Sequence, residues 1–227
     1  AGLIASMSFV ALGQPALARL KDTEPPFGAN NQASTEVSIW KRKSTQAIIL
    51  PIFFVGAYFG SVGITVLAFL NSIERPELTG ALLALWALGS ATAAIFNGVI
   101  KWRMNHAQLF TYSLAFMLVA SFALLLVNNV WQLAVVLYLN GIGISPVLVN
   151  AYATMESEVS TEELTEAMTW VTTGTPTGGA LGSALAGQVI DSFGASQGFW
   201  IPIAALIIAN LALLPYLNVW LRLRSRS

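Results

Sequence analysis

The chain alternates long apolar runs with short polar connections. Seven runs contain no Asp, Glu, Lys, Arg or His, and the first of them is short and stops at Arg19. Because the apolar core of a bilayer is about 30 Å thick, a helix that crosses it needs roughly 20 apolar residues. Six runs reach that length and predict transmembrane helices over 46–70, 78–100, 107–127, 130–155, 167–190 and 198–221.

The longest polar stretch lies between the first run and the second. It contains EPPFGANNQAST, which has no apolar periodicity and predicts a flexible linker. The chain is therefore expected to be an all-α integral membrane protein with four parts. These are the truncated end of a preceding transmembrane helix at 1–20, a linker at 21–45, a six-helix transmembrane half at 46–221 and a basic tail at 222–227.

The basic residues lie almost entirely on one side of the predicted membrane. If the spans alternate in direction, ten of the eleven Lys and Arg residues fall on one face and only Arg75 falls on the other. Basic residues in short connections mark the cytoplasmic side. We therefore expect a multi-pass protein of the cell membrane, in the lipid bilayer, with the linker, the acidic connection 156–166 and the C-terminus in the cytoplasm.

An alternative interpretation of the first run is a signal peptide. The run ends in Ala16-Leu17-Ala18, which resembles a cleavage site. It lacks a basic segment at its start, however. Cleavage would also place the ten basic residues on the outer face, against the usual charge bias. The end of a membrane span is the favoured interpretation.

The composition agrees with lipid as the solvent. Hydrophobic residues make up 56% of the chain and charged residues 10%, whereas soluble domains carry roughly 25% charged residues. Eleven basic and eleven acidic residues cancel, which indicates no nucleic-acid partner. The chain has no cysteine, and its single histidine, His106, is expected to be a solvated loop residue, so neither a metal site nor a cofactor is predicted. Five tryptophans, most of them near span ends, are interpreted as anchors at the membrane surface: Trp86, Trp102, Trp131, Trp170 and Trp200.

One predicted helix consists largely of small residues. The stretch TTGTPTGGALGSALAGQVID (172–191) contains five glycines and one proline, which would weaken a helix in water. In lipid, small residues allow neighbouring helices to approach closely. Two faces of the helix carry them at intervals of four residues: Gly174, Gly178 and Gly182 on one face, and Gly179, Ser183 and Gly187 on the adjoining face.

The start and the bend of this helix are also predicted. Ser160 and Glu163 have the spacing of a capping box, so the helix is expected to begin in the preceding connection. Pro176 interrupts the backbone hydrogen bonds, and the hydroxyls of Thr172 and Thr173 are expected to satisfy the carbonyls that it frees. The helix is expected to be an interface element that bends or slides, although small residues also suit a static bundle.

Taken together, six spans that follow a linker and the end of an earlier span resemble the C-terminal half of a major facilitator superfamily transporter. Residues 165–200 resemble the eleventh helix and the following turn of bacterial arabinose or drug efflux permeases. GTPTGG (174–179) is similar to the G-P-x-x-G-G antiporter motif of that family, with Thr175 as an extra residue. GVIKWRMNH (98–106) occupies the place of a basic loop but lacks the acidic residue and the second glycine of the family's gating loop.

The resemblance implies two inverted three-helix repeats and a partner, an N-terminal six-helix half. It also implies that 46–70 is the seventh helix of the family and 130–155 the tenth, and that both line a cavity for a small-molecule substrate. The candidate cavity residues on these two helices are Phe54, Tyr58, Ser61, Tyr138, Asn140 and Asn150. Interhelical hydrogen bonding is an alternative role for the two asparagines, because a buried amide needs a partner.

For the small-residue helix, a role in gating or helix packing is expected of Gly174, Pro176, Gly178, Gly179 and Gly182. None of the spans contains a charged residue, and proton-coupled transport needs a titratable group in the pathway. If transport is coupled to protons, that group belongs to the first half.

The expected function is secondary active transport of a small solute, a sugar or a drug-like compound, by alternating access, with efflux as the expected direction. An enzyme is not expected, because the spans offer no His, Asp or Glu for catalysis. The alternative is an inert or scaffolding half-protein, since one half alone has no opposing wall for alternating access.

Overall fold

Six long helices make up most of the chain that the structure describes. The computed structural model describes residues 43–100 and 104–222, which all belong to one compact unit. The predicted span end at 1–20, most of the linker and most of the basic tail lie outside the described residues. Within them there is no strand, and the elements in chain order are α2 (Lys43–Ser72), η3 (Pro76–Leu78), α3 (Thr79–Val99), α4 (His106–Phe122), η4 (Ala123–Leu126), α5 (Val130–Glu158), α6 (Thr161–Phe193), η5 (Ala195–Phe199) and α7 (Trp200–Arg222).

Five of the six long helices are long and apolar enough to cross a membrane. The sixth, α6, has 33 residues, which at about 1.5 Å per residue is ample length, but it is rich in threonine and glycine and its hydropathy is lower. The expected all-helical membrane bundle is therefore confirmed for five spans. The crossing by α6 stays a prediction.

Local sequence accounts for where several helices begin and end. The side chain of Asn105 accepts a hydrogen bond from the backbone N–H of Gln108 at 2.8 Å and caps α4. At the start of α6, the backbone N–H of Ser160 donates to the Glu163 carboxylate at 3.3 Å, so the predicted capping box is present. The helix ends at Gly194, whose φ of +94° is a conformation that other residues rarely adopt.

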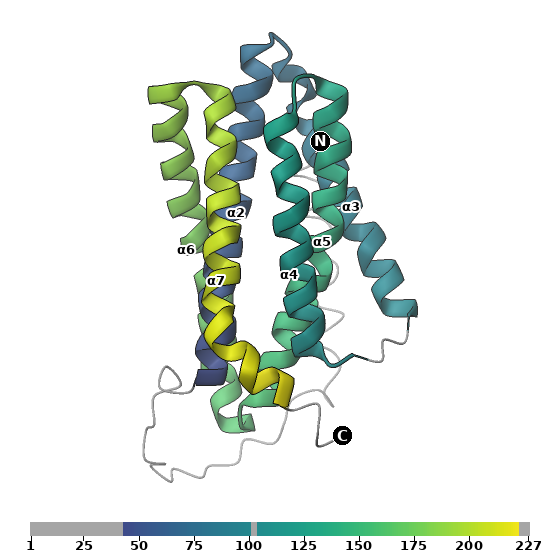
Figure 1. Cartoon of the computed structure of the whole chain (residues 1–227), viewed down its shortest axis with the longest axis vertical. Helices are drawn as coiled ribbons and strands as arrows, with labels where there is room; N and C mark the ends of the chain where they lie inside the picture. Colours follow the sequence, from purple (N-terminus) through teal and green to yellow (C-terminus); the bar gives the residue numbers. More distant parts are fainter. Residues whose placement is uncertain (1–42, 101–103, 223–227) are drawn as a thin grey trace, which may run out of the picture. The chain divides into compact units, whose positions relative to one another are not determined.

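The helices pair in a pattern that is the same for the first three and the last three (Figure 1). In the first group, α2 packs against α6 and α7. In the second group, which comprises α5, α6 and α7, α5 packs against α3 and α4. The third helices of the two groups, α4 and α7, also pack against each other. Each group's first helix thus contacts the second and third helices of the other group, as two interlocked repeats would.

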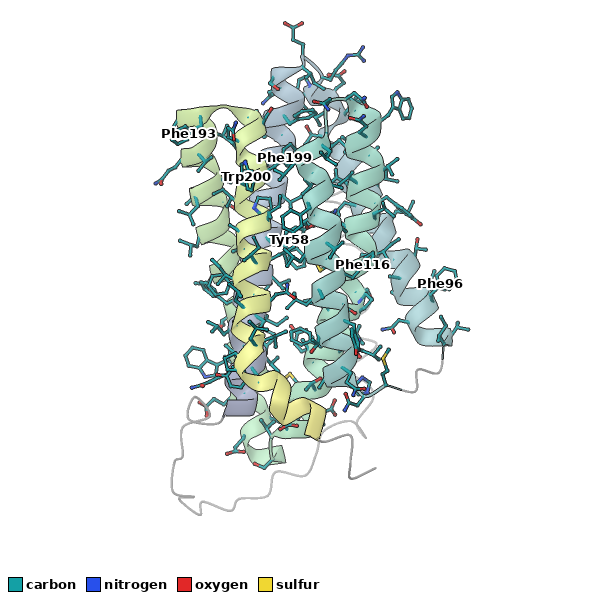
Figure 2. All side chains as sticks on the ribbon, in the orientation of Figure 1. Tyr58, Phe96, Phe116, Phe193, Phe199 and Trp200 are labelled. Atoms are coloured by element: carbon teal, nitrogen blue, oxygen red, sulfur yellow. The ribbon has the colours of Figure 1, made fainter. Side chains whose placement is uncertain are left out.

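The first two long helices, α2 and α3, differ in how much of their surface is buried. The central apolar stretch of α2 is 61% buried, whereas that of α3 is only 17% buried. Figure 2 shows Phe96, near the end of α3, pointing away from the other helices, and this side chain is 60% exposed. The structure therefore joins α3 to the rest of the unit mainly through α5.

Candidate functional site

Close backbone contact joins α2 to α6. A Cβ added to Gly178 would collide with the carbonyl oxygen of Phe53, and a Cβ added to Gly56 would collide with the carbonyl oxygen of Thr175. The contact repeats one turn further along, where Gly60 faces the carbonyl oxygen of Gly179, and Gly182 faces that of Ala57. Only glycine at these four positions permits two helices to lie so close together.

The other glycines of α6 have different surroundings. A Cβ at Gly179 would lie 3.5 Å from the carbonyl oxygen of Gly56, which is an ordinary contact, while at Gly174 and Gly187 it would meet nothing within 4 Å. Ser183 borders the contact, because its hydroxyl oxygen would lie 2.7 Å from a Cβ on Gly60. The structure thus places Gly178 and Gly182 at the contact with α2 and leaves Gly174 beside open space.

The outward face of α6 carries threonines around Pro176. Thr172, Thr173, Pro176 and Thr177 are all exposed. The Thr173 hydroxyl donates to the carbonyl of Thr169 at 2.6 Å, and the Thr177 hydroxyl donates to the carbonyl of Thr173 at 2.7 Å. A hydroxyl that donates to its own helix costs little in an apolar medium while its oxygen still accepts from a neighbour.

These bonds correct one expectation. Pro176 deprives the carbonyl of Thr172, four residues earlier, of its usual donor. The Thr172 hydroxyl instead donates to the carbonyl of Met168 at 2.9 Å, and that of Thr173 donates to Thr169. Both hydroxyls therefore bond carbonyls that precede the one freed by the proline, because a threonine side chain in a helix reaches back by one turn.

A second close crossing joins α3 to α5. A Cβ on Gly89 would collide with the carbonyl oxygen of Tyr138, and a Cβ on Gly141 would collide with that of Trp86. The two glycines lie against each other at this point, and both are buried. Unlike the contact between α2 and α6, this crossing occurs once.

A fully satisfied amide lies beside the second crossing. The Oδ1 atom of Asn140 accepts from the hydroxyls of Tyr58 at 3.1 Å and Ser121 at 2.6 Å, and its Nδ2 donates to the carbonyls of Ala120 and Val136. Tyr58, Ser121 and Asn140 are all fully buried, and Figure 2 shows Tyr58 inside the bundle. Asn140 thus links α2, α4 and α5, in keeping with the interhelical role left open for it.

Aromatic rings extend this polar cluster toward α3. The Trp86 ring lies 6.1 Å from the Tyr58 ring and 5.7 Å from the Phe59 ring, measured between centroids, in edge-on arrangements. The Tyr138 hydroxyl donates to the Thr92 hydroxyl at 3.3 Å, and both residues are half-buried. Trp86 is therefore a packing residue in the middle of α3, which corrects its interpretation as an anchor at a span end.

The remaining candidate cavity residues lie on both sides of this cluster. Phe54 is half-buried and meets Phe53 edge-on at 5.4 Å, whereas Ser61 is fully buried and donates to the carbonyl of Tyr58 at 3.0 Å. Asn150 is buried too, and its Nδ2 donates to the carbonyl of Pro146 at 2.7 Å. Their role as cavity residues stays a prediction.

His106 is exposed, as expected of a solvated residue, but it belongs to a helix instead of a loop. It is the first residue of α4, and its Nδ1 lies 2.9 Å from the Oδ1 of Asn150. Because the Asn150 amide already donates to Pro146, its oxygen accepts here and the histidine Nδ1 carries the proton. No sequence pattern pairs these residues, which lie 44 positions apart.

Two hollows open on the surface of the described residues. One, of about 270 Å³, lies between α4 and α7, and the other, of about 450 Å³, lies at the junction of η4 and α5 beside Trp131. Their walls are apolar apart from Thr111 and Asn210 in the first and Gln132 in the second. Neither is lined by a candidate cavity residue.

Comparison with known proteins places the whole bundle in one family. A search of curated protein sequences finds no match. The family described as the Major Facilitator Superfamily matches residues 43–227, which include every described helix. Its members are transporters rather than enzymes. The chain therefore belongs to the Major Facilitator Superfamily.

Proposed function

We propose that the chain is the C-terminal half of a secondary active transporter that moves a small solute across the cell membrane by alternating access. Membership of the family makes transport the function class. The finer proposal rests on the interlocked pairing of the two helix groups, in which α2 contacts α6 and α7 as α5 contacts α3 and α4. Halves of such transporters are built from two inverted three-helix repeats, and two related repeats that interlock would give this reciprocal pairing.

The proposed substrate is a sugar or a drug-like compound, with efflux as the direction. A substrate with polar and apolar parts would suit the partly exposed aromatic and hydroxyl groups of Tyr138, Thr92 and Phe54. Tyr58, Ser61, Asn140 and Asn150 are buried within this half, so they would meet substrate only after a rearrangement. We therefore place Tyr138 first among the cavity residues.

The direct test compares two proteins in the same cells: the complete reading frame that contains this chain together with a preceding six-helix half, and this chain alone. Cells that accumulate a panel of labelled sugars and fluorescent drugs would report transport. The proposal predicts lower accumulation of at least one compound with the complete protein only. Equal accumulation in both strains and in empty cells would favour the inert or scaffolding half-protein.

A second test addresses the cavity. In the complete transporter, Tyr138→Phe removes one hydroxyl and keeps the ring, and we expect a several-fold change in apparent affinity for a substrate that accepts or donates a hydrogen bond. Trp131→Phe is a matched control, because Trp131 is 83% exposed at the far end of the same helix. Identical kinetics for Tyr138→Phe and the control would remove Tyr138 from the cavity.

The proposed orientation is tested with single cysteines, which this cysteine-free chain accepts without a background. Labels applied from the cytoplasm should react at Asn31→Cys and Ser225→Cys, and labels applied from outside should react at Glu74→Cys. The basis is the bias of ten basic residues to one side. Labelling of Asn31→Cys from outside would reverse the orientation and revive the signal peptide.

A further inference from the structure

One face of α6 is both exposed and polar. Four exposed threonines surround Pro176 on it, and we call them the threonine face: Thr169, Thr172, Thr173 and Thr177. At about 100° per residue, these four positions lie within an arc of roughly 140° and along about two turns of the helix. The exposed faces of α4 and α7 instead carry large apolar side chains such as Val119 and Leu211. Hydroxyl groups gain nothing from lipid tails, so the threonine face suits a polar neighbour.

The hydroxyl hydrogens of the threonine face are all used within α6. Each hydroxyl donates to the carbonyl four residues earlier, at distances from 2.6 to 2.9 Å. A carbonyl oxygen can only accept, which fixes the direction of these bonds, and a hydroxyl has one hydrogen to give. The four side-chain oxygens can therefore only accept from a further partner.

Pro176 adds a backbone acceptor to the same face. Its ring nitrogen carries no hydrogen, so the carbonyl of Thr172 loses its usual donor. Within the part of the chain that the structure describes, the nearby hydroxyls of Thr173 and Thr177 donate to other carbonyls. The threonine face thus combines four hydroxyl oxygens with one carbonyl that lacks its usual bond.

The candidate cavity residue Tyr138 has the same polarity. Its hydroxyl donates to the Thr92 hydroxyl at 3.3 Å, and the Thr92 hydroxyl donates to the carbonyl of Leu88 at 2.8 Å. Because the only hydrogen of Thr92 goes to a carbonyl, Tyr138 must be the donor of the first bond. The Tyr138 oxygen is therefore left to accept from any further partner, as on α6.

We propose that the threonine face, together with the Thr172 carbonyl, binds hydrogen-bond donors of the transported solute, which are hydroxyl or ammonium groups. A group that can only accept, such as an ether or a carboxylate, finds no donor on this surface. The inference rests on the proposed function and deepens it, because it names the chemistry by which the transporter selects its solute.

The test compares compounds with and without hydrogens to donate. Phenethylammonium and its N,N,N-trimethyl derivative carry the same charge, and phenyl β-D-glucoside and its tetra-O-methyl ether carry the same oxygens. Binding of all four, in tritiated form, is measured on the complete transporter in lipid nanodiscs. One hydrogen bond corresponds to about tenfold in affinity, so we expect at least one parent compound to bind about tenfold or more tightly than its methylated form. The pair that discriminates identifies the donor as ammonium or hydroxyl.

Variants separate hydrogen bonding from the added bulk of the methyl groups. Valine has the shape of threonine without the oxygen, so Thr173→Val combined with Thr177→Val removes two acceptors from exposed positions. We expect the double variant to bind the parent compound about tenfold or more weakly and to bind the methylated form unchanged. Thr111→Val is the matched control. Its hydroxyl also donates to the carbonyl four residues earlier, at 2.9 Å, but it lies on α4, and its loss should leave the discrimination intact.

Three results would overturn the inference. The first is equal affinity within both pairs of compounds, and the second is absence of binding by both parent compounds. The third is full discrimination in the double variant; if its melting temperature also falls, the threonine face packs against another helix instead. Transport by the complete protein of a panel compound without such discrimination would end this inference and leave the proposed function standing.

Discussion

The contact between α2 and α6 and the contact between α3 and α5 follow one geometric rule. At each crossing, a glycine faces the carbonyl that lies three residues before the glycine on the other helix. Gly60 and Gly182 obey this rule between α2 and α6, as Gly141 and Gly89 do between α5 and α3. The two crossings are therefore equivalent, and their residues can be matched position by position.

Matched in this way, the two pairs differ in bulk. The α2–α6 pair repeats the crossing one turn away with Gly56 and Gly178, whereas Leu137 and Leu85 occupy the matching positions of α5 and α3. Leucine side chains prevent a second close approach there. The residues whose carbonyls face the glycines differ as well. Trp86 of α3 matches Gly179 of α6, and Tyr138 of α5 matches Ala57 of α2, so the α3–α5 crossing has two large aromatic side chains where the other has small residues.

This difference gives the two pairs different mechanical characters. Two successive glycine crossings hold α2 and α6 in register along two turns, which suits a rigid pair. The α3–α5 pair also packs along its length but has a single glycine crossing, with large aromatic side chains beside it. On this comparison we expect α6 to be held more rigidly than α3. The expectation that the small-residue helix bends or slides stays a prediction.

The largest expected effect is loss of the double crossing. Gly182→Ala places a methyl group against the carbonyl of Ala57, and the α2–α6 pair must separate to accept it. We expect a loss of about 3 kcal/mol or more in stability, measured as a lowered melting temperature in detergent. Gly174→Ala is the matched control on the same helix. Its methyl group meets open space, so its melting temperature should be unchanged or higher.

A smaller effect is expected at the single crossing. Gly89→Ala drives a methyl group against the carbonyl of Tyr138, but only one glycine crossing must open here instead of two. The expected loss is about 1–2 kcal/mol, with the contact of α2 and α6 intact. Gly98→Ala, also on α3, adds its methyl group to open space and controls for helix propensity. A greater loss for Gly89→Ala than for Gly182→Ala would reverse the comparison.

The amide network should rank next. Asn140→Leu leaves the Tyr58 and Ser121 hydroxyls without their shared acceptor, and we expect a loss of about 1 kcal/mol. Adding Ser121→Ala to Asn140→Leu should cost nearly nothing more, because the serine would already lack that partner. If the stability losses of Asn140→Leu and Ser121→Ala, measured by thermal unfolding, add up to the loss of the double variant, the two residues do not form one network.

The smallest effect on stability is expected at Pro176. Its ring is on the exposed face of α6, so Pro176→Ala restores a backbone N–H donor without disturbing α2. The melting temperature should be equal to that of the parent or higher. Turnover in the complete transporter should fall if the proline bend is used in gating. Normal flux in a folded Pro176→Ala protein would leave α6 with a packing role only.

The sequence predicted the helical membrane bundle well, because apolar length and the capping box of Ser160 and Glu163 are local signals. It also pointed to α6 as a helix of small residues, among which Gly178 and Gly182 lie at a contact. It could not show that the partner of α6 is α2. Long-range pairing is set by how several helices pack together, and no spacing within one helix encodes it.

The candidate site shows the same limit. Tyr58, Tyr138 and Asn140 were singled out as polar or aromatic residues within apolar spans. The structure joins Tyr58 on α2 to Asn140 on α5, while Tyr138 bonds Thr92 on α3. Ser121 was missed because one serine in an apolar run carries no distinguishing signal. Trp86 was assigned to the membrane surface, and its position in the middle of α3 was the one available warning.

The account is tested most directly by comparing the two helix pairs within one protein. In the complete transporter in nanodiscs, spin labels across α2 and α6 at Leu50→Cys and Thr172→Cys, and across α3 and α5 at Val99→Cys and Val149→Cys, are measured by pulsed electron–electron double resonance. These four side chains are exposed. We predict a single narrow distance for the first pair and a broad or double distribution for the second. A narrow distance for α3–α5 together with a broad one for α2–α6 would contradict the account.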